Sequence, residues 1–138
     1  MTYSLQLGGS KQLAQNAAAQ YRTALGVYLA IYAIAGLLAI IVPSLVGHAL
    51  ALAAPYGGIR PIGGLMLLYA AFQLPVFQDA MRSRVPALIA TAGRFLLALL
   101  WLLAGRYFVW IALFEIVFAV LLAWLIYKYM AAEVMSRP

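Results

Sequence analysis

The sequence predicts an all-α integral membrane protein, in which four transmembrane helices form a bundle and residues 1–138 make one domain. Of the 138 residues, 67% are hydrophobic and only 9% are charged, whereas soluble domains carry about 25% charged residues. The apolar residues are gathered into four long runs, and a helix of about 20 apolar residues crosses the hydrocarbon core of a bilayer. Composition and run length together exclude a soluble globular domain.

The first predicted span covers residues 24–42, carries no charge and ends before Pro43. Upstream, residues 10–23 are rich in good helix formers, and Ser10 follows the glycine pair Gly8-Gly9 in a position where it can cap a helix. We therefore expect the first helix to begin near Ser10 and to extend into the cytoplasm before it enters the membrane.

The second predicted span covers residues 61–78 and begins with Pro61, because proline fits the first position of a helix. Pro75 lies inside this span and is expected to kink or end the helix near its last turn. The preceding connection, residues 43–58, is too apolar for an ordinary loop. Its composition predicts a short helix that lies on the membrane surface.

The third and fourth predicted spans, residues 85–104 and 107–127, are joined by a turn at Gly105-Arg106 and form an antiparallel pair. Basic residues favour the cytoplasmic side of a membrane. Six of them flank one side of the four spans and two flank the other, so we expect both termini in the cytoplasm. The six are Lys11, Arg22, Arg82, Arg84, Lys128 and Arg137, and the two are Arg60 and Arg106.

Two opposite charges, Arg94 and Glu115, interrupt the third and fourth apolar runs. Each lies about ten residues from the turn, which is roughly 15 Å at the helical rise of 1.5 Å per residue. That depth is close to the middle of a hydrocarbon core ~30 Å thick. A charge at such a depth is costly and marks a partner or a functional site. We predict that Arg94 and Glu115 pair with each other inside the bundle.

The residues around the two charges predict which helix faces meet. Helices in lipid approach each other through small residues, and each charge lies on a stripe of small residues at helical spacing. The stripe of the third span consists of Ala87, Ala90, Thr91, Arg94 and Ala98, and that of the fourth consists of Ala112, Glu115, Ala119 and Ala123. The opposite face of the third span is bulky and is expected to face lipid.

The same depth on the first two spans holds Tyr32 and Tyr69, with Tyr28 and Gln73 each one turn away. Together with the two charges, these residues predict one buried polar layer. Two compatible interpretations follow. The layer either fixes the register of the helices, because breaking a buried pair costs about 3–5 kcal/mol, or it lines a small pocket that binds the polar head of a ligand.

Arg60 is a further candidate for binding a head group. It stands in a glycine-dense helix start, residues 57–64, whose free N–H groups favour an anion. The competing interpretation is an arginine whose side chain reaches the membrane interface. Trp101 and the other aromatic residues at the span ends are interpreted as interfacial anchors.

The chain contains no cysteine and one histidine, His48. This excludes thiol chemistry, protein-held iron–sulfur clusters and bis-histidine haem within the chain, and no metal site is predicted. The basic residues flank the apolar runs instead of clustering, so nucleic acid is not an expected partner. We expect no cofactor held by this chain itself, and membrane lipid or quinone as the ligand of the polar layer.

The start of the second span, Gly58–Gly64, the Gly93-Arg94 pair and Glu115, together with the four-span layout, resemble the DoxX-like group of small four-helix bacterial membrane proteins, its uncharacterised branches included. The resemblance covers roughly residues 25–127. It implies a bundle in the bacterial inner (plasma) membrane, found alone or beside membrane oxidoreductases. For some relatives it implies a subunit role in quinone-linked oxidation, but without cysteine or a second histidine it implies no redox centre in this chain.

Three functions follow from these observations. The first is a non-catalytic accessory or scaffold subunit of a membrane complex, or a homo-oligomer, whose polar layer binds a lipid or quinone head group. The second is an enzyme that uses Glu115 as acid or base, although an adjacent arginine stabilises the ionised carboxylate and disfavours proton donation. The third is a small proton-coupled transporter that uses Glu115. We expect the first.

Overall fold

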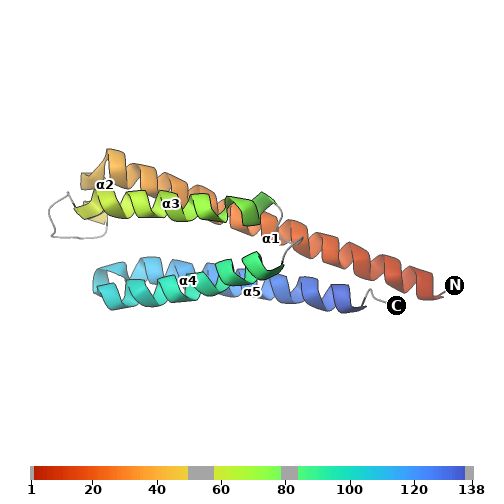
Figure 1. The fold of residues 1–138 in the computed structure, drawn as a ribbon. Coiled ribbons are helices and arrows are strands. Elements are labelled where there is room, and N and C mark those ends of the chain that lie inside the picture. The colour runs from red at the N-terminus through yellow and green to blue at the C-terminus, as the bar shows by residue number, and fades with distance from the viewer. Residues whose placement is uncertain (1, 50–57, 79–83, 136–138) are drawn as a thin grey trace.

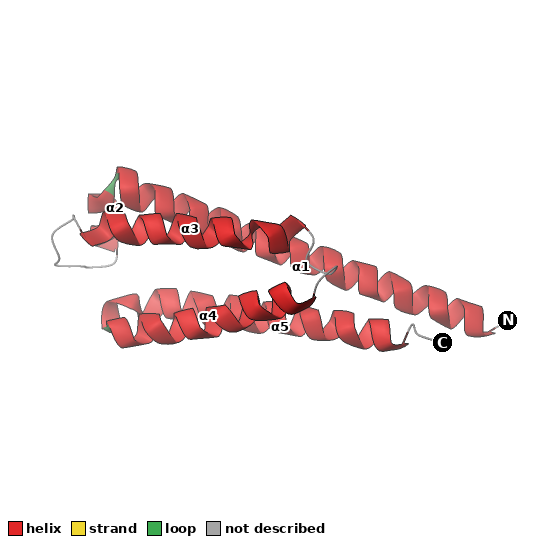
Figure 2. Ribbon diagram, in the orientation of Figure 1, coloured by secondary structure: helices red, strands yellow, loops and turns green. Residues whose placement is uncertain are grey.

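The computed structural model describes residues 2–49, 58–78 and 84–135, and for residues 2–8 it describes the backbone alone. Within this part almost every residue is helical, as Figure 2 shows. The elements in chain order are α1 (Thr2–Ile41), α2 (Pro43–Ala49), α3 (Ile59–Gln78), α4 (Arg84–Ala104), the short 3-10 helix η2 (Arg106–Phe108) and α5 (Val109–Met135).

Four of these helices, α1, α3, α4 and α5, are long and apolar enough to cross a membrane. This confirms the prediction of an all-helical chain with four helices of transmembrane length and composition. Both termini lie at one end of the molecule, which we call the terminal end, and α2 and the α4–α5 turn lie at the other, the turn end (Figure 1). Which end faces the cytoplasm stays a prediction, and two of its basic residues, Arg82 and Arg137, lie outside the described part of the chain.

The long helices are arranged as two pairs. α1 packs along α3, and α4 packs along α5, while extensive contact between α1 and α5 joins the pairs. α3 and α4 contact each other little, and the two pairs diverge towards the turn end (Figure 1). The backbones of the two pairs are therefore closer together towards the terminal end and further apart at the turn end.

Two glycines allow the close approach of α1 and α3. A Cβ atom added at Gly63 would lie 2.6 Å from the backbone oxygen of Gly36, and one added at Gly36 would lie 2.9 Å from the oxygen of Gly63. Distances this short are repulsive, so the two backbones can touch only because neither residue has a side chain. A third glycine, Gly105, has a φ of +121° and makes the turn between α4 and η2.

The predicted small-residue stripes of α4 and α5 are buried, with the exception of Ala90 and Ala123, which are half-buried. The bulky face of α4 is exposed, as expected for a surface that meets lipid; it includes Phe95, Leu96, Leu99 and Leu103. The periodicity of side-chain size thus predicted correctly which faces of these two helices turn inward.

The expected start of the first helix at Ser10 is wrong, because α1 begins at Thr2 and runs through Gly8 and Gly9. Glycine costs a helix only about 1 kcal/mol relative to alanine, and the helix formers that follow offset that cost. Pro75 does not end α3, which continues to Gln78. The expected short helix after Pro43 is present as α2, and residues 50–57 of that connection lie outside the described residues.

Candidate ligand-binding site

Glu115 on α5 is the acceptor at the centre of a buried hydrogen-bond network. The hydroxyl of Tyr28 donates to both carboxylate oxygens, at 2.9 Å to Oε1 and 3.1 Å to Oε2. The hydroxyl of Tyr32, one turn further along α1, donates to Oε1 as well. Glu115 and Tyr28 are 0% exposed, and hydrogen bonds to a buried carboxylate are stronger than those between neutral groups. The network ties α1 to α5.

Arg94 on α4 occupies the other side of the same tyrosine. Its guanidinium carbon lies 3.4 Å from the centroid of the Tyr28 ring, in a cation–π contact. Its Nη2 donates to the amide oxygen of Gln73 on α3. Arg94 is 0% exposed. One arginine on α4 thus contacts both helices of the other pair.

The predicted direct pairing of Arg94 with Glu115 is wrong. Between these two described side chains no nitrogen and oxygen atoms lie within salt-bridge distance. Tyr28 stands between them, with its ring face towards the guanidinium and its hydroxyl towards the carboxylate. The two charges do lie at a similar depth and belong to one network. Counting residues along α4 and α5 could not predict that a side chain of α1 lies between them.

The aromatic neighbours of Tyr28 hold it in this position. Its ring stacks on that of Tyr32 with centroids 4.5 Å apart, and on that of Phe114 with centroids 5.6 Å apart. Phe118 adds a tilted contact at 5.4 Å. Such aromatic contacts stabilise the Tyr28 ring in its position between the two charges.

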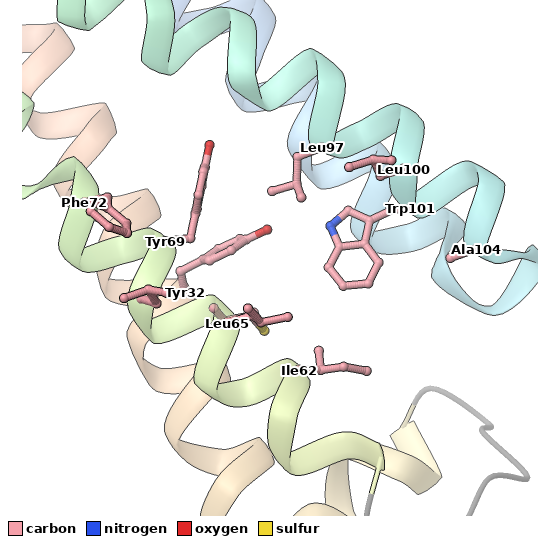
Figure 3. Close-up of a pocket in the computed structure, with 11 residues that line it drawn as sticks. Tyr32, Ile62, Leu65, Tyr69, Phe72, Leu97, Leu100, Trp101 and Ala104 are labelled. Atoms are coloured by element: carbon pink, nitrogen blue, oxygen red, sulfur yellow. The ribbon is translucent and has the colours of Figure 1, made fainter.

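A first cavity of about 440 Å³ lies beside this network, in the gap between α3 and α4. Its wall is almost entirely apolar, and Tyr32 forms its side towards α1 (Figure 3). The other lining residues are Ile62, Leu65, Met66, Leu68, Tyr69 and Phe72 of α3 and Leu97, Leu100, Trp101 and Ala104 of α4. Because α3 and α4 contact each other little, this cavity is open to the outside of the bundle between these two helices.

Two buried polar atoms in the wall of the first cavity make no hydrogen bond of good geometry among the described residues, although polar side chains lie near both: Tyr32 near Trp101, and Gln73 and Tyr28 near Tyr69. They are the hydroxyl oxygen of Tyr69 and Nε1 of Trp101. The indole ring of Trp101 stacks on Phe108 of η2, with centroids 5.2 Å apart, and its nitrogen lies on the edge that faces Tyr32 (Figure 3). An indole N–H can only donate, and a buried donor without a partner is unfavourable. A ligand with an accepting oxygen can take a hydrogen bond from either donor.

A second cavity of about 400 Å³ lies on another side of Tyr32, among α1, α2, α3 and α5. Its lining is also apolar and includes Ala35 and Leu38 of α1, Leu45 and Val46 of α2, and Trp110 of α5. The rest of its wall is formed by Ile31, Tyr32, Ala39, Ala49, Ile62, Met66, Ile111 and Phe114.

The structure brings together five of the six predicted site residues. Arg94, Glu115, Tyr32 and Gln73 belong to the network, and Tyr69 lines the first cavity. Arg60 is exposed at the start of α3 and lines neither cavity. Arg94, Gln73 and Glu115 also line neither cavity; they lie behind the tyrosines. The lining residues of the first cavity that carry a polar group are Tyr32, Tyr69 and Trp101.

Trp101 is the cavity-lining polar residue that sequence reasoning missed, because tryptophan near a span end is usually an interfacial anchor. A signal was present: Trp101 follows Arg94 by two turns, through Ala98, on the inward face of α4. Tyr28 was placed in the polar layer, but its central position was not foreseen.

Comparisons with protein-family models, with curated proteins and with solved structures find no match for this chain.

Proposed function

We propose that this protein is a non-catalytic integral membrane protein whose first cavity binds a lipid or a quinone from the membrane, with the polar head beside Tyr69 and Trp101. The observation that carries the proposal is an apolar cavity between α3 and α4 that opens to the outside of the bundle and has only three polar side chains in its wall, those of Tyr32, Tyr69 and Trp101. Cavities of about 300–1,000 Å³ with an apolar wall and few polar groups are typical ligand sites.

The position of Glu115 favours binding over catalysis. Its carboxylate accepts hydrogen bonds from two tyrosines and lines neither cavity. A general acid or base must reach the proton that it transfers, directly or through one water. Because Tyr32 separates Glu115 from both cavities, the enzyme and the proton-coupled transporter that rely on this residue have less support than a binding role.

The proposal extends to the setting in which the protein works. The predicted cytoplasmic termini and the resemblance to the DoxX-like group support a bacterial inner membrane protein that acts as an accessory or scaffold subunit, for example of a quinone-linked redox complex, or as a homo-oligomer. The long α1 supports this role because it continues far beyond the length that a bilayer requires. That surplus length offers a helical surface to a partner.

A matched pair of variants on α4 tests ligand binding. Leu97 lines the first cavity, and the neighbouring Leu96 is exposed and lines neither cavity. The proteins are purified in mild detergent, and bound lipids and quinones are identified by native mass spectrometry. We expect the unmodified protein and Leu96→Trp to retain a stoichiometric lipid or quinone and Leu97→Trp to lose it, because the indole fills the cavity. Equal retention by all three proteins would contradict the proposed site.

A further inference from the structure

The second cavity lies among α1, α3 and α5, three helices of transmembrane length, and its wall at the turn end belongs to α2 (Figure 1). The wall is almost entirely apolar, and the hydroxyl of Tyr32 is directed to Glu115 instead of into this space. Apolar spaces of this kind do not hold water. An ion or a polar ligand would find no partner among the lining residues, so the wall suits hydrocarbon.

The cavity extends along the helix axes from the turn end to the level of the polar network. On α1 its wall runs from Ala39, near the end of the helix, back to Ile31, which is about 12 Å away at 1.5 Å per residue. At its inner end Phe114 adjoins Glu115, which is predicted to lie near the middle of the bilayer. The cavity therefore extends from the predicted membrane surface at α2 to about the depth of one lipid leaflet.

The volume and length of the cavity decide between a hydrocarbon chain and a helix as its occupant. A volume of about 400 Å³ over a length of about 12 Å corresponds to a mean cross-section of roughly 33 Å². A helix with its side chains is about 10 Å across and has a cross-section of roughly 80 Å². Neither a helix of a partner nor a helix of a second copy fits this space, whereas a single row of methylene groups does.

The cavity also opens to the outside of the bundle. Four of its lining residues are exposed on the outer surface of α1, α2 and α5, namely Ile31, Leu38, Leu45 and Trp110. At this depth the surroundings of a membrane protein are the hydrocarbon chains of the bilayer. An unfilled apolar space forfeits the dispersion contacts of its lining atoms, so the entry of a neighbouring chain is favourable through packing.

We propose that the second cavity binds one hydrocarbon chain of a membrane lipid from the leaflet at the turn end. The lipid keeps its ordinary orientation, with its head at the membrane surface beside α2 and the end of its chain beside Phe114. The chain stays in the second cavity, so no passage to the first cavity is required. This site is independent of the proposed function, and its occupant fills the space that the diverging helix pairs leave between α1 and α5.

Photolabelling with two phosphatidylcholines tests both the site and the orientation of the chain. Each probe carries a diazirine on one chain, next to the head in one probe and at the end of the chain in the other. The full-length protein is reconstituted in phosphatidylcholine vesicles that contain one probe, and labelled residues are identified by mass spectrometry. We expect the diazirine next to the head to label Leu45 and Val46 and the diazirine at the chain end to label Phe114.

A matched pair of alanines on α1 provides the control. Ala35 lines the second cavity, whereas Ala30 is exposed and lines neither cavity. We expect Ala35→Trp to lose the labelling of Phe114, because the indole occupies the space of the chain, and Ala30→Trp to retain it. Leu113, which is exposed on α5 and lines neither cavity, should be labelled in every variant by the surrounding lipid. Leu45→Trp fills the same cavity from the exposed side of α2 and should repeat the loss without a change in α1.

Four results would overturn the proposed site. Labelling of Leu113 without Phe114 would show that chains surround the protein but do not enter. Labelling of Phe114 by the diazirine next to the head would reverse the orientation. Equal labelling of Phe114 in Ala35→Trp and Ala30→Trp would place the chain elsewhere. A dimer in native mass spectrometry that Ala35→Trp dissociates, with Phe114 unlabelled, would assign the cavity to a second copy. Each of these results leaves the proposed function intact, because that function concerns the first cavity.

Discussion

The two ends of the helix bundle are built from the same four helices but pack in opposite ways. At the terminal end, Tyr21 and Leu25 of α1 and Leu122 and Leu125 of α5 are buried in one continuous core. At the turn end the helix pairs separate around two cavities. The polar network of Arg94, Tyr28 and Glu115 lies at the boundary between the closed and the open half.

The difference between the two ends shows how the buried charges contribute to helix packing. In lipid there is no hydrophobic force to bring helices together, so packing and buried polar contacts hold a bundle closed. The network joins α1, α3, α4 and α5 at one depth. Beyond it, no polar contact among the described residues joins α3 to α4, and space for a ligand opens. The network thus holds the helices together where the packed core of the terminal end stops. The cavities of the turn end begin beside it.

The largest expected effect comes from removing the carboxylate. Glu115→Ala leaves the buried hydroxyls of Tyr28 and Tyr32 without their acceptor, and the loss of two hydrogen bonds to a charged group, at about 1.5–3 kcal/mol each, costs about 3–6 kcal/mol. We expect the free energy of unfolding in detergent to fall by that amount, with α1 and α5 separating. Glu133→Ala is the control, because that carboxylate is partly exposed and pairs with Arg84 near the helix ends. Equal losses in the two variants would contradict a central role of Glu115.

A smaller effect is expected from Tyr28→Phe, which tests the bridge directly. The ring that contacts Arg94 is kept, and the hydroxyl that donates to Glu115 is removed. Hydrogen bonds to charged groups contribute about 1.5–3 kcal/mol, and a loss of this size in the free energy of unfolding is expected. Tyr28→Leu, which also removes the cation–π contact, should lose more. If Phe and Leu behave alike, the ring contributes nothing to holding Arg94.

The smallest expected effect concerns the α1–α3 pair that forms one wall of the open half. Gly63→Ala places a methyl group against the Gly36 backbone, and overpacking of this kind costs about 1–3 kcal/mol. Gly64→Ala is the matched control on the same turn, because its added Cβ would meet no atom within 4 Å. Thermal unfolding followed by circular dichroism should show a lower midpoint for Gly63→Ala. A midpoint equal to that of Gly64→Ala would show that α1 and α3 are not in close contact.

The sequence by itself determined the features of this protein that depend on neighbouring residues. Hydropathy along the chain located the four long helices, Gly105 located the turn, and the spacing of small residues identified the inward faces of α4 and α5. Depth counting placed Tyr32, Tyr69, Gln73, Arg94 and Glu115 in one region. These are local quantities, because rise per residue and helical period are fixed by backbone geometry.

Only the tertiary structure decided how the helices are rotated and tilted against one another. The rotation of α1 put Tyr28 between Arg94 and Glu115, and the divergence of the helix pairs created cavities lined by Tyr32 and Trp101. Rotation and tilt are set by the simultaneous packing of all four helices, and the pattern of one helix contains no information on its neighbours' side chains. For that reason the sequence could predict a polar layer. It could not predict that Tyr28 lies between Arg94 and Glu115, or that cavities lie beside the layer.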